Sequence, residues 1–303
     1  MINVTKPLSQ ESAVALGLFD GIHLGHQKVL AAAVQCSKDG LLPCAFTFNA
    51  STFPKKHGRE LEFLYTEEYK QSLLENIGIK AVLTANFFDI GEMNGESFCR
   101  NILKDMLHAK KVFCGSDFRF GKNAACSFTE LAEFGQNMGF EVICIESVCI
   151  DGSEVSSTRI REYLNEGCTE KAQELFGRPY AVSGVVVHGK KLGRTINFPT
   201  INQNFQKGQL VPAKGVYLSR ISLPDGRRYF GVTNIGVKPT VSYENIPLAE
   251  THLLDFKGDL YGAYCTTELL HFIRPEKKFE NIKVLQTAIM QDIEKARKLA
   301  LFI

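Results

Sequence analysis

The first half of the chain alternates short apolar runs with segments in which apolar residues recur at helical spacing. The runs typical of buried strands cover residues 13–16, 42–48, 79–84, 110–114 and 141–145. The helical pattern covers residues 67–76, 96–107 and 128–138, and Gly78 and Gly139 follow two of these segments. This alternation predicts a Rossmann-like α/β domain with a parallel sheet and helices on both faces. Ligands of such sheets bind at the carboxyl ends of the strands.

From residue 181 onward the pattern changes to short strands separated by turn signals. The candidate strands cover residues 182–187, 215–223, 228–235, 250–255 and 263–273. Pro224-Asp225-Gly226 marks a hairpin turn. The spacing predicts a small antiparallel β-barrel, and apolar positions at helical spacing over 280–299 predict a C-terminal helix that packs on it. We therefore expect two domains, residues 1–179 and 180–303.

Composition narrows the class of protein. A chain of 303 residues with 45% hydrophobic and 22% charged residues can fold into two globular domains. The formal net charge of +2 gives no electrostatic reason to expect a nucleic-acid or membrane partner. We find no apolar run of membrane-spanning length and no secretory signal in MINVTKPLSQES. The nine cysteines form no C-x-x-C pair, which argues against zinc or a disulfide framework and favours the cytoplasm.

One stretch carries the first candidate chemistry, residues 16–27, which read LGLFDGIHLGHQ. An apolar strand breaks at Gly17 and Gly21, and a helical pattern restarts at Gly25. Such a turn directs backbone N–H groups and a positive helix end at an anion. His23 and His26 are spaced to share one helix face and to hold the α-phosphate of a nucleotide. The alternative is a surface loop with two solvated histidines.

The whole string resembles the HxGH signature of the nucleotidyltransferase superfamily, and GLFDGIHLGH resembles its flavin-specific branch. The resemblance implies a nucleotide site that includes Gly17, Phe19, Asp20 and Gly25.

A second motif, GSDFRFGK at residues 115–122, directly follows the fourth predicted strand of the first half. Asp117, Phe118 and Arg119 are suited to clamping an aromatic ligand; the alternative is a packed loop in which Asp117 and Arg119 pair with each other. The motif resembles the GxDFRFG loop of bacterial flavin adenylyltransferases, which implies flavin binding by these three residues.

A third motif, VSSTRIR at residues 155–161, places hydroxyl residues and arginines at a helix start. This arrangement suits β- and γ-phosphates, although a capped helix with solvated arginines would give the same pattern. It resembles the SSTxIR signature of the same family. The resemblance implies attack on the α-phosphate, with Arg159, Ser157 and Thr158 at the leaving pyrophosphate.

The segment TFNASTFP at residues 47–54 departs from this family. Many relatives carry a TFxPHP-like sequence here, and this chain lacks its first proline and its histidine. We therefore assign no flavin contact to this segment.

The second half carries a glycine-spaced basic loop, HGKKLGRT at residues 188–195, followed by FPTIN at 198–202. The loop is suited to wrapping phosphates, and the oxygens of Thr200 and Asn202 are ligands of the kind that Mg²⁺ takes beside phosphates. Alone, such a loop is more often structural than catalytic.

Five segments occur in the order and spacing of the riboflavin kinase signature. They are HGKKLGRTINFPTIN (188–202), GVY (215–217), NIGVKPT (234–240), ETHLLDFKGDLYG (250–262) and FIRPEKKF (272–279). Nearly the whole chain thus resembles the bacterial bifunctional riboflavin kinase/FAD synthetases. Asn197 stands where relatives commonly have glycine, and we expect the loop to keep its fold.

The resemblance implies a role for each residue of the second half. Glu250 would be the general base, although a strand-end carboxylate in a salt bridge fits the spacing equally well. The remaining implied roles are Mg²⁺ and ATP binding by Thr200 and Asn202, nucleotide contacts from Gly189 and Gly193, and flavin contacts from Tyr217 and Arg274.

We therefore expect a monomeric or weakly associating enzyme that phosphorylates riboflavin to FMN with Mg-ATP and adenylylates FMN to FAD. Its partners would be the small molecules riboflavin, FMN and ATP. The alternatives are an enzyme with one active domain and a flavin-binding regulator derived from such an enzyme.

Overall fold

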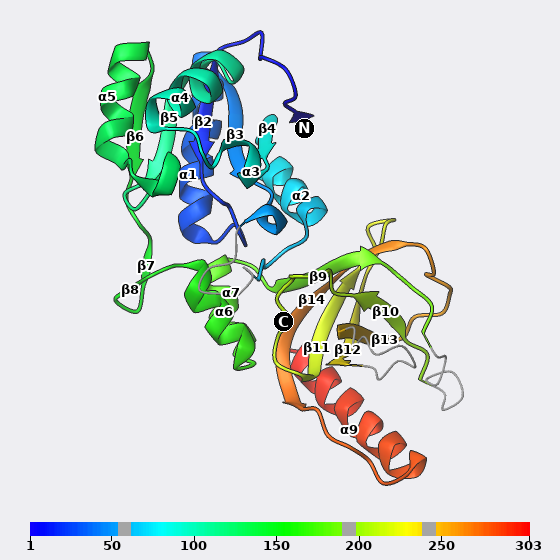
Figure 1. Ribbon diagram of the computed structural model, residues 1–303. Coiled ribbons are helices and arrows are strands. Elements are labelled where there is room, and N and C mark those ends of the chain that lie inside the picture. The colour runs from blue at the N-terminus through cyan, green and yellow to red at the C-terminus, as the bar shows by residue number, and fades with distance from the viewer. Residues whose placement is uncertain (54–61, 190–197, 238–246) are drawn as a thin grey trace. The chain divides into compact units, whose positions relative to one another are not determined.

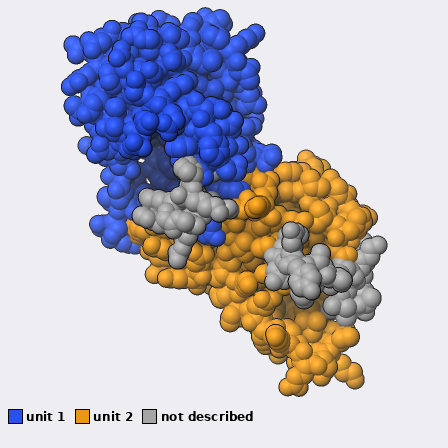
Figure 2. Space-filling view, viewed as in Figure 1, with its two compact units in different colours: residues 1–63, 67–157 blue, residues 64–66, 158–303 orange. Residues whose placement is uncertain are grey.

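The computed structural model describes residues 1–53, 62–189, 198–237 and 247–303 (Figure 1). The chain divides into two compact units, which Figure 2 colours differently. Unit 1 consists of residues 1–63 and 67–157, and unit 2 of residues 64–66 and 158–303. The sequence predicts a boundary between the adenylyltransferase and kinase domains at residues 179/180, and this boundary stays a prediction.

Unit 1 is built on a six-stranded parallel sheet with the strand order β1-β4-β3-β2-β5-β6. The strands are β1 (Ile2–Asn3), β2 (Ser12–Leu16), β3 (Leu42–Phe48), β4 (Ala81–Ala85), β5 (Ala109–Gly115) and β6 (Glu141–Ile145). All five strand pairs are parallel. The predicted α/β class is thereby confirmed, and within this sheet the two-residue β1 is the strand that the sequence pattern did not reveal.

Helices cover both faces of this sheet. On one face, α1 (Leu24–Gln35) and α2 (Glu67–Ile77) bury Leu30 and Leu74 against Ala13 and Ala45. On the other face, α4 (Gly95–Phe98), the π-helical η3 (Cys99–Met106) and α5 (Phe128–Met138) pack on the strands. The helix predicted over 96–107 is thus an α-helical turn that continues as a π-helix. Short elements also belong to the unit: η1 (Cys36–Asp39), η2 (Ala50–Thr52), α3 (Phe87–Ile90), η4 (Lys122–Ala124), β7 (Cys149–Ile150) and β8 (Ser153–Glu154).

The strand order of unit 1 reverses between two central strands. The chain runs outward from β2 through β3 and β4 and then crosses back to β5, which pairs with β2. In open α/β sheets the ligand crevice lies at this topological switch point, beyond the carboxyl ends of the strands. The turn after β2 and the loop after β5 both leave the sheet there, and they carry the first two motifs.

Unit 2 contains a six-stranded antiparallel sheet with the order β10-β13-β12-β11-β14-β9. The strands are β9 (Tyr180–Val185), β10 (Ile201–Asn204), β11 (Gly215–Ser222), β12 (Arg228–Val237), β13 (Pro247–Leu253) and β14 (Tyr264–Pro275). A bridge between Val187 and Asn202 joins the segment after β9 to β10, so the barrel is nearly closed. The predicted barrel is confirmed, and β10 is the strand that the sequence pattern did not reveal.

Helices also belong with the barrel: α6 (Ser157–Asn165), which begins in unit 1, α7 (Thr169–Phe176) and α9 (Ile282–Ala300). The C-terminal helix α9 buries Ala296 and Ile293 against Leu218 and Val232. This confirms the predicted closing helix. In the described residues, no helix combines the length and apolar character that a membrane crossing requires.

A short piece of the first half belongs to unit 2. The ring of Tyr65 stacks on Tyr180, with centroids 5.4 Å apart, and meets the ring of Phe176 at a tilt, with centroids 5.6 Å apart. The Tyr180 hydroxyl donates hydrogen bonds to the carbonyl oxygens of Leu64 and Leu210. We call Leu64–Thr66 the inserted segment, because the chain on both sides of it belongs to unit 1.

Candidate active sites

The turn between β2 and α1 has a strained backbone. Phe19 (φ 49°) and Ile22 (φ 46°) adopt the left-handed conformation that favours glycine, and Gly21 between them has φ 84°. Each such residue costs about 1–3 kcal/mol, and strain of this kind clusters at functional sites. Both side chains are completely buried in the α1 face of the sheet, where each contributes roughly 1.5–3 kcal/mol. Burial of the two side chains therefore offsets the strain of the turn.

The two signature histidines lie together at the start of α1. Their rings stack, with centroids 3.7 Å apart, and His23 is the N-cap whose Nδ1 accepts a hydrogen bond from the backbone N–H of His26 at 3.4 Å. An Nδ1 that accepts leaves Nε2 as the nitrogen that carries a proton, and a ring N–H is a donor suited to a phosphate oxygen. The predicted placement at a helix start is therefore correct.

Two glycines of the motif lie close to aromatic rings of the turn. A Cβ on Gly17 would lie 2.9 Å from the ring of Phe19, and a Cβ on Gly25 would lie 3.2 Å from the ring of His23. The Phe19 ring in turn meets His26 edge-on at 5.4 Å. Asp20 is also buried, and its backbone carbonyl accepts a hydrogen bond from the Ser157 hydroxyl at 2.8 Å.

The loop after β5 presents polar and aromatic side chains. Asp117 and Arg119 are exposed, and Phe118 is half-buried and stacks on the buried Phe120 with centroids 5.8 Å apart. Within the part of the chain that the structure describes, Asp117 and Arg119 form no ion pair with each other. The alternative, a packed loop in which Asp117 and Arg119 pair with each other, is therefore not what the structure shows.

The third motif opens α6, with Ser157 as its first residue. Thr158 is exposed, and the guanidinium of Arg159 lies 3.4 Å from the Tyr163 hydroxyl and 5.8 Å from the centre of its ring. Ser157 belongs to unit 1, whereas Thr158 and Arg159 belong to unit 2.

In unit 2, strand pairing assembles the candidate kinase residues. Glu250 on β13 pairs with Asn202 on β10 and with Asn234 on β12. Directly paired residues of an antiparallel sheet point to the same face, so the three side chains form one row. Asn202 is buried, and a Cβ on Gly189 would lie 2.6 Å from its amide nitrogen. Gly189 therefore has room only for a hydrogen at this contact.

On the opposite face of β12 and β13, and on the neighbouring β11, three hydroxyl residues form a chain. The Thr233 hydroxyl donates to Ser219 at 2.6 Å and lies 2.8 Å from that of Thr251. All three are completely buried. Because they link β11, β12 and β13, they hold the register that places Glu250 beside Asn234.

The segment that carries Thr200 is fastened to β13. The carbonyl of Pro199 lies 2.8 Å from Nδ1 of His252, and the ring of Phe198 meets His252 edge-on at 5.7 Å. Thr200 is half-buried and immediately precedes β10. Gly193 and Asn197 lie outside the described residues.

Comparisons with known proteins agree with this arrangement. A family model described as FAD synthetase matches residues 5–159, and one described as riboflavin kinase matches residues 176–300. The chain is 35% identical to the bifunctional riboflavin kinase/FMN adenylyltransferase of Haemophilus influenzae, over 95% of this chain and 94% of that one. It is 34% identical to the Pseudomonas fluorescens protein of the same name, over 97% and 95%. The chain belongs to the bifunctional riboflavin kinase/FMN adenylyltransferase family.

A solved structure of this architecture is similar over its whole length. It is named as a macrolide-efflux protein from Streptococcus pneumoniae and is 28% identical, with a TM-score of 0.84 over 98% of this chain and 99% of that one.

Two of the residues predicted to contact the flavin, Arg274 and Tyr217, make contacts within the protein. The Arg274 guanidinium forms a two-pronged ion pair with Asp292 of α9, at 2.9 Å and 2.7 Å. Tyr217 is completely buried, its hydroxyl donates to the Ala213 carbonyl, and burial raises the pKa of that hydroxyl. Their flavin contacts stay predictions.

Sequence reasoning assigned no role to three residues of unit 2 that contact or pair with the predicted kinase residues or the segment that carries them. Asn234 lies in a quoted motif, but only the strand pairing places it beside Glu250. His252 and Asp292 act through contacts with residues 53 and 18 positions away, which no local pattern reveals.

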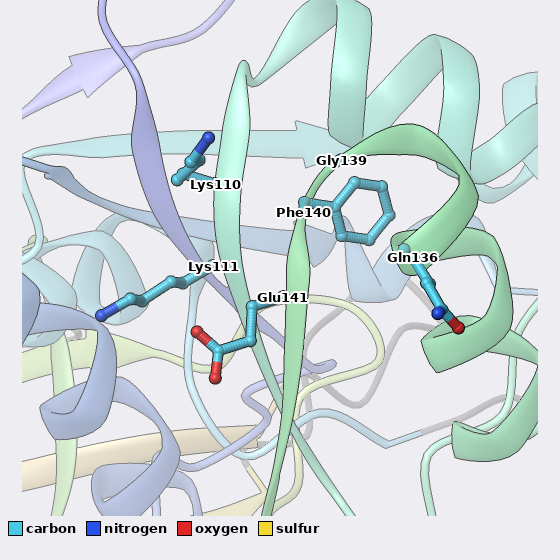
Figure 3. A pocket seen from close by; sticks show the side chains of 7 residues that line it. Lys110, Lys111, Gln136, Gly139, Phe140 and Glu141 are labelled. Carbon is cyan, nitrogen blue, oxygen red and sulfur yellow. The ribbon is translucent and has the colours of Figure 1, made fainter.

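Unit 1 also has a surface pocket, away from the turn that carries His23 and His26. It is lined by Lys110 and Lys111 of β5, Phe140 and Glu141 near the start of β6, and the end of α5 (Figure 3). These residues are at the amino ends of the strands, opposite the end from which the glycine turn leaves the sheet. The candidate adenylyltransferase site is therefore a different place.

Proposed function

We propose that the chain converts riboflavin and ATP to FMN, and FMN and a second ATP to FAD and pyrophosphate. One observation carries the proposal. Both family models match, and each matched segment contains its own assembled group of signature residues: the glycine turn with His23 and His26, and the row of Asn202, Glu250 and Asn234.

In the kinase half, Glu250 takes the proton from the terminal ribityl hydroxyl while that oxygen attacks the γ-phosphorus of ATP and ADP leaves. Asn202 and Asn234 flank the carboxylate in the strand ladder and orient the reacting groups. Because Glu250 lies on a strand that is paired on both sides, its backbone is fixed, which favours a fixed geometry for proton transfer.

Mg²⁺ fits the residues of this half. Among the described residues, no three or more His, Cys, Asp or Glu side chains cluster as a metal site. Mg²⁺ bound beside nucleotide phosphates needs only a few oxygen ligands from the protein, and the hydroxyl of Thr200 and the buried amide of Asn202 are such ligands. When bound, the ion neutralises charge on the ATP phosphates.

In the adenylyltransferase half, a phosphate oxygen of FMN attacks the α-phosphorus of ATP and pyrophosphate leaves, so no protein nucleophile is needed. We assign His23 and His26 to the α-phosphate, and Thr158 and Arg159 to the leaving pyrophosphate. Ser157, which the sequence also predicted at the pyrophosphate, donates its hydroxyl proton to the Asp20 carbonyl instead. Phe118 with Asp117 and Arg119 contacts the flavin. Positioning and charge stabilisation supply the catalysis.

Chromatography of a reaction of the purified chain with riboflavin, ATP and Mg²⁺, beside one started from FMN, tests both activities. We expect FMN and FAD in the first reaction and FAD in the second. FMN alone would mean that only the kinase half is active. Tight flavin binding without conversion would favour the regulator.

We also infer that the chain works in the cytoplasm as a monomer or weak oligomer without a nucleic-acid partner. The near-neutral charge and the nine free cysteines support this inference. Light scattering of the purified chain tests its association. Retention of the chain on immobilised RNA at low salt would contradict the absence of a nucleic-acid partner.

A further inference from the structure

Three side chains fasten the strained turn by its carbonyl groups. The Thr47 hydroxyl donates to the carbonyl of Leu18 at 2.7 Å, the Ser157 hydroxyl to that of Asp20 at 2.8 Å, and the Gln27 amide to that of Ile22 at 2.9 Å. The donors come from β3, from the start of α6 and from α1. We call Thr47, Ser157 and Gln27 the carbonyl clamp.

The spacing of the fastened carbonyls has a geometric consequence. In a trans peptide unit, the C=O of one residue and the N–H of the next point in opposite directions. Fixing the carbonyls of residues 18, 20 and 22 therefore fixes the N–H directions of Phe19, Gly21 and His23. The last of these is the N-cap of α1 and the first histidine of the signature.

The clamp also explains how the strain persists. Phe19 and Ile22 hold left-handed φ values that an isolated chain would relax. The carbonyl just before Phe19 and the carbonyl of Ile22 itself are both fastened. Thr47 is completely buried at the carboxyl end of β3, so its hydroxyl is held rigidly. Rigid support of this kind is what precise placement of reacting groups requires.

We propose that Thr47 and Gln27, together with Ser157, are positioning residues for adenylyl transfer: they act on His23 and the turn rather than on the substrates. This inference rests on the adenylyltransferase activity proposed above. Removal of one donor should shift the turn and lower kcat for FAD formation from FMN, while the riboflavin kinase rate of the same molecules stays unchanged.

Thr47→Val removes the hydroxyl and keeps the shape of the side chain. We expect it to lower kcat for FAD formation about 10- to 100-fold, because small displacements of reacting groups cost that much. Thr47→Ser keeps the donor and should restore most of the rate. Gln27→Met, which removes a donor from a different element, should reproduce the loss independently.

Thr84→Val is the matched control. Thr84 on β4 pairs directly with Thr47 on β3, and within the described residues its buried hydroxyl makes no hydrogen bond. This variant should retain the wild-type rate of FAD formation.

Several outcomes would overturn the proposal. Equal kcat values for Thr47→Val and Thr84→Val would show that the Thr47 hydroxyl has no positioning role. A Thr47→Ser variant as slow as Thr47→Val would show that the shape of the side chain is responsible. A parallel loss of riboflavin kinase activity would indicate general unfolding. A wild-type chain that forms no FAD would defeat the proposed function itself, whereas an active wild type with an unaffected Thr47→Val defeats only the clamp.

Discussion

In unit 1 the candidate phosphate-binding histidines lie on a turn and at a helix start, whereas in unit 2 the candidate kinase residues lie on three paired strands. The turn holds two non-glycine residues in left-handed conformations. The strands hold Asn202, Glu250 and Asn234 by ordinary ladder pairing. A turn takes its geometry from surrounding side chains, while a ladder takes it from its own backbone hydrogen bonds. The first site should therefore respond to substitutions around it, and the second chiefly to changes in the reacting residues.

The largest expected effect is that of Glu250→Gln in unit 2. Loss of the general base should lower riboflavin phosphorylation about 10³-fold, within the usual range for such groups. Conversion of FMN to FAD should continue, since its residues lie on other elements. Separate assays from riboflavin and from FMN measure this split. Full kinase activity in the variant would refute the base assignment.

His26→Ala should give the reverse split. We expect FAD formation to fall about 10²- to 10³-fold, as when a group that stabilises developing charge is removed, with riboflavin phosphorylation intact. Unchanged FAD synthesis would mean that the stacked histidines do not contact the α-phosphate.

Sequence patterns anticipated most of the fold, but not how the candidate site residues are held in place. The apolar runs predicted five strands of the parallel sheet, because each strand contains a short apolar stretch; β2 is buried along its whole length and β3 along most of it. Strand β10 reads INQN, and its polar Asn202 and Gln203 hid it, since both are buried by partners far away in the chain. The left-handed φ of Ile22 was unpredictable because tertiary burial overrides the local preference of a β-branched residue.

Asp292→Ala tests whether unit 2 depends on more than its ladder. The buried carboxylate pairs with Arg274, so its removal leaves a guanidinium that is only 21% exposed without its partner. We expect a loss of about 3 kcal/mol in the free energy of unfolding of the kinase unit. Denaturant titration, with riboflavin phosphorylation as the probe, measures it.

Glu294→Ala on the same helix is the control for that variant. Its ion pair with Lys298 is exposed on both sides, so stability should not change measurably. Equal stabilities of the two variants would contradict a structural role for the Arg274–Asp292 pair. An Asp292→Ala variant that instead weakens riboflavin binding would favour the predicted flavin contact of Arg274.

The smallest expected effect is that of Gly17→Ala. The added methyl group would lie 2.9 Å from the Phe19 ring, so the ring must shift against His26. We expect FAD formation to fall about tenfold, with roughly 1–3 kcal/mol lost from the stability of unit 1. Gly40→Ala, where a Cβ meets nothing within 4 Å but the φ of 80° is left-handed, separates backbone strain from the ring contact. It should lower stability and leave the rate of FAD formation unchanged.

The inserted segment has a consequence for how this polypeptide can be divided. The chain passes between the two units three times, after residues 63, 66 and 157. No single cut in the gene therefore yields both units whole. A fragment that ends at residue 157 carries Tyr65 without Tyr180 and Phe176, and a fragment that begins at residue 158 exposes those two rings. Separate genes for the two activities would require a substitute for the contacts that residues 64–66, encoded within the first half, make in unit 2.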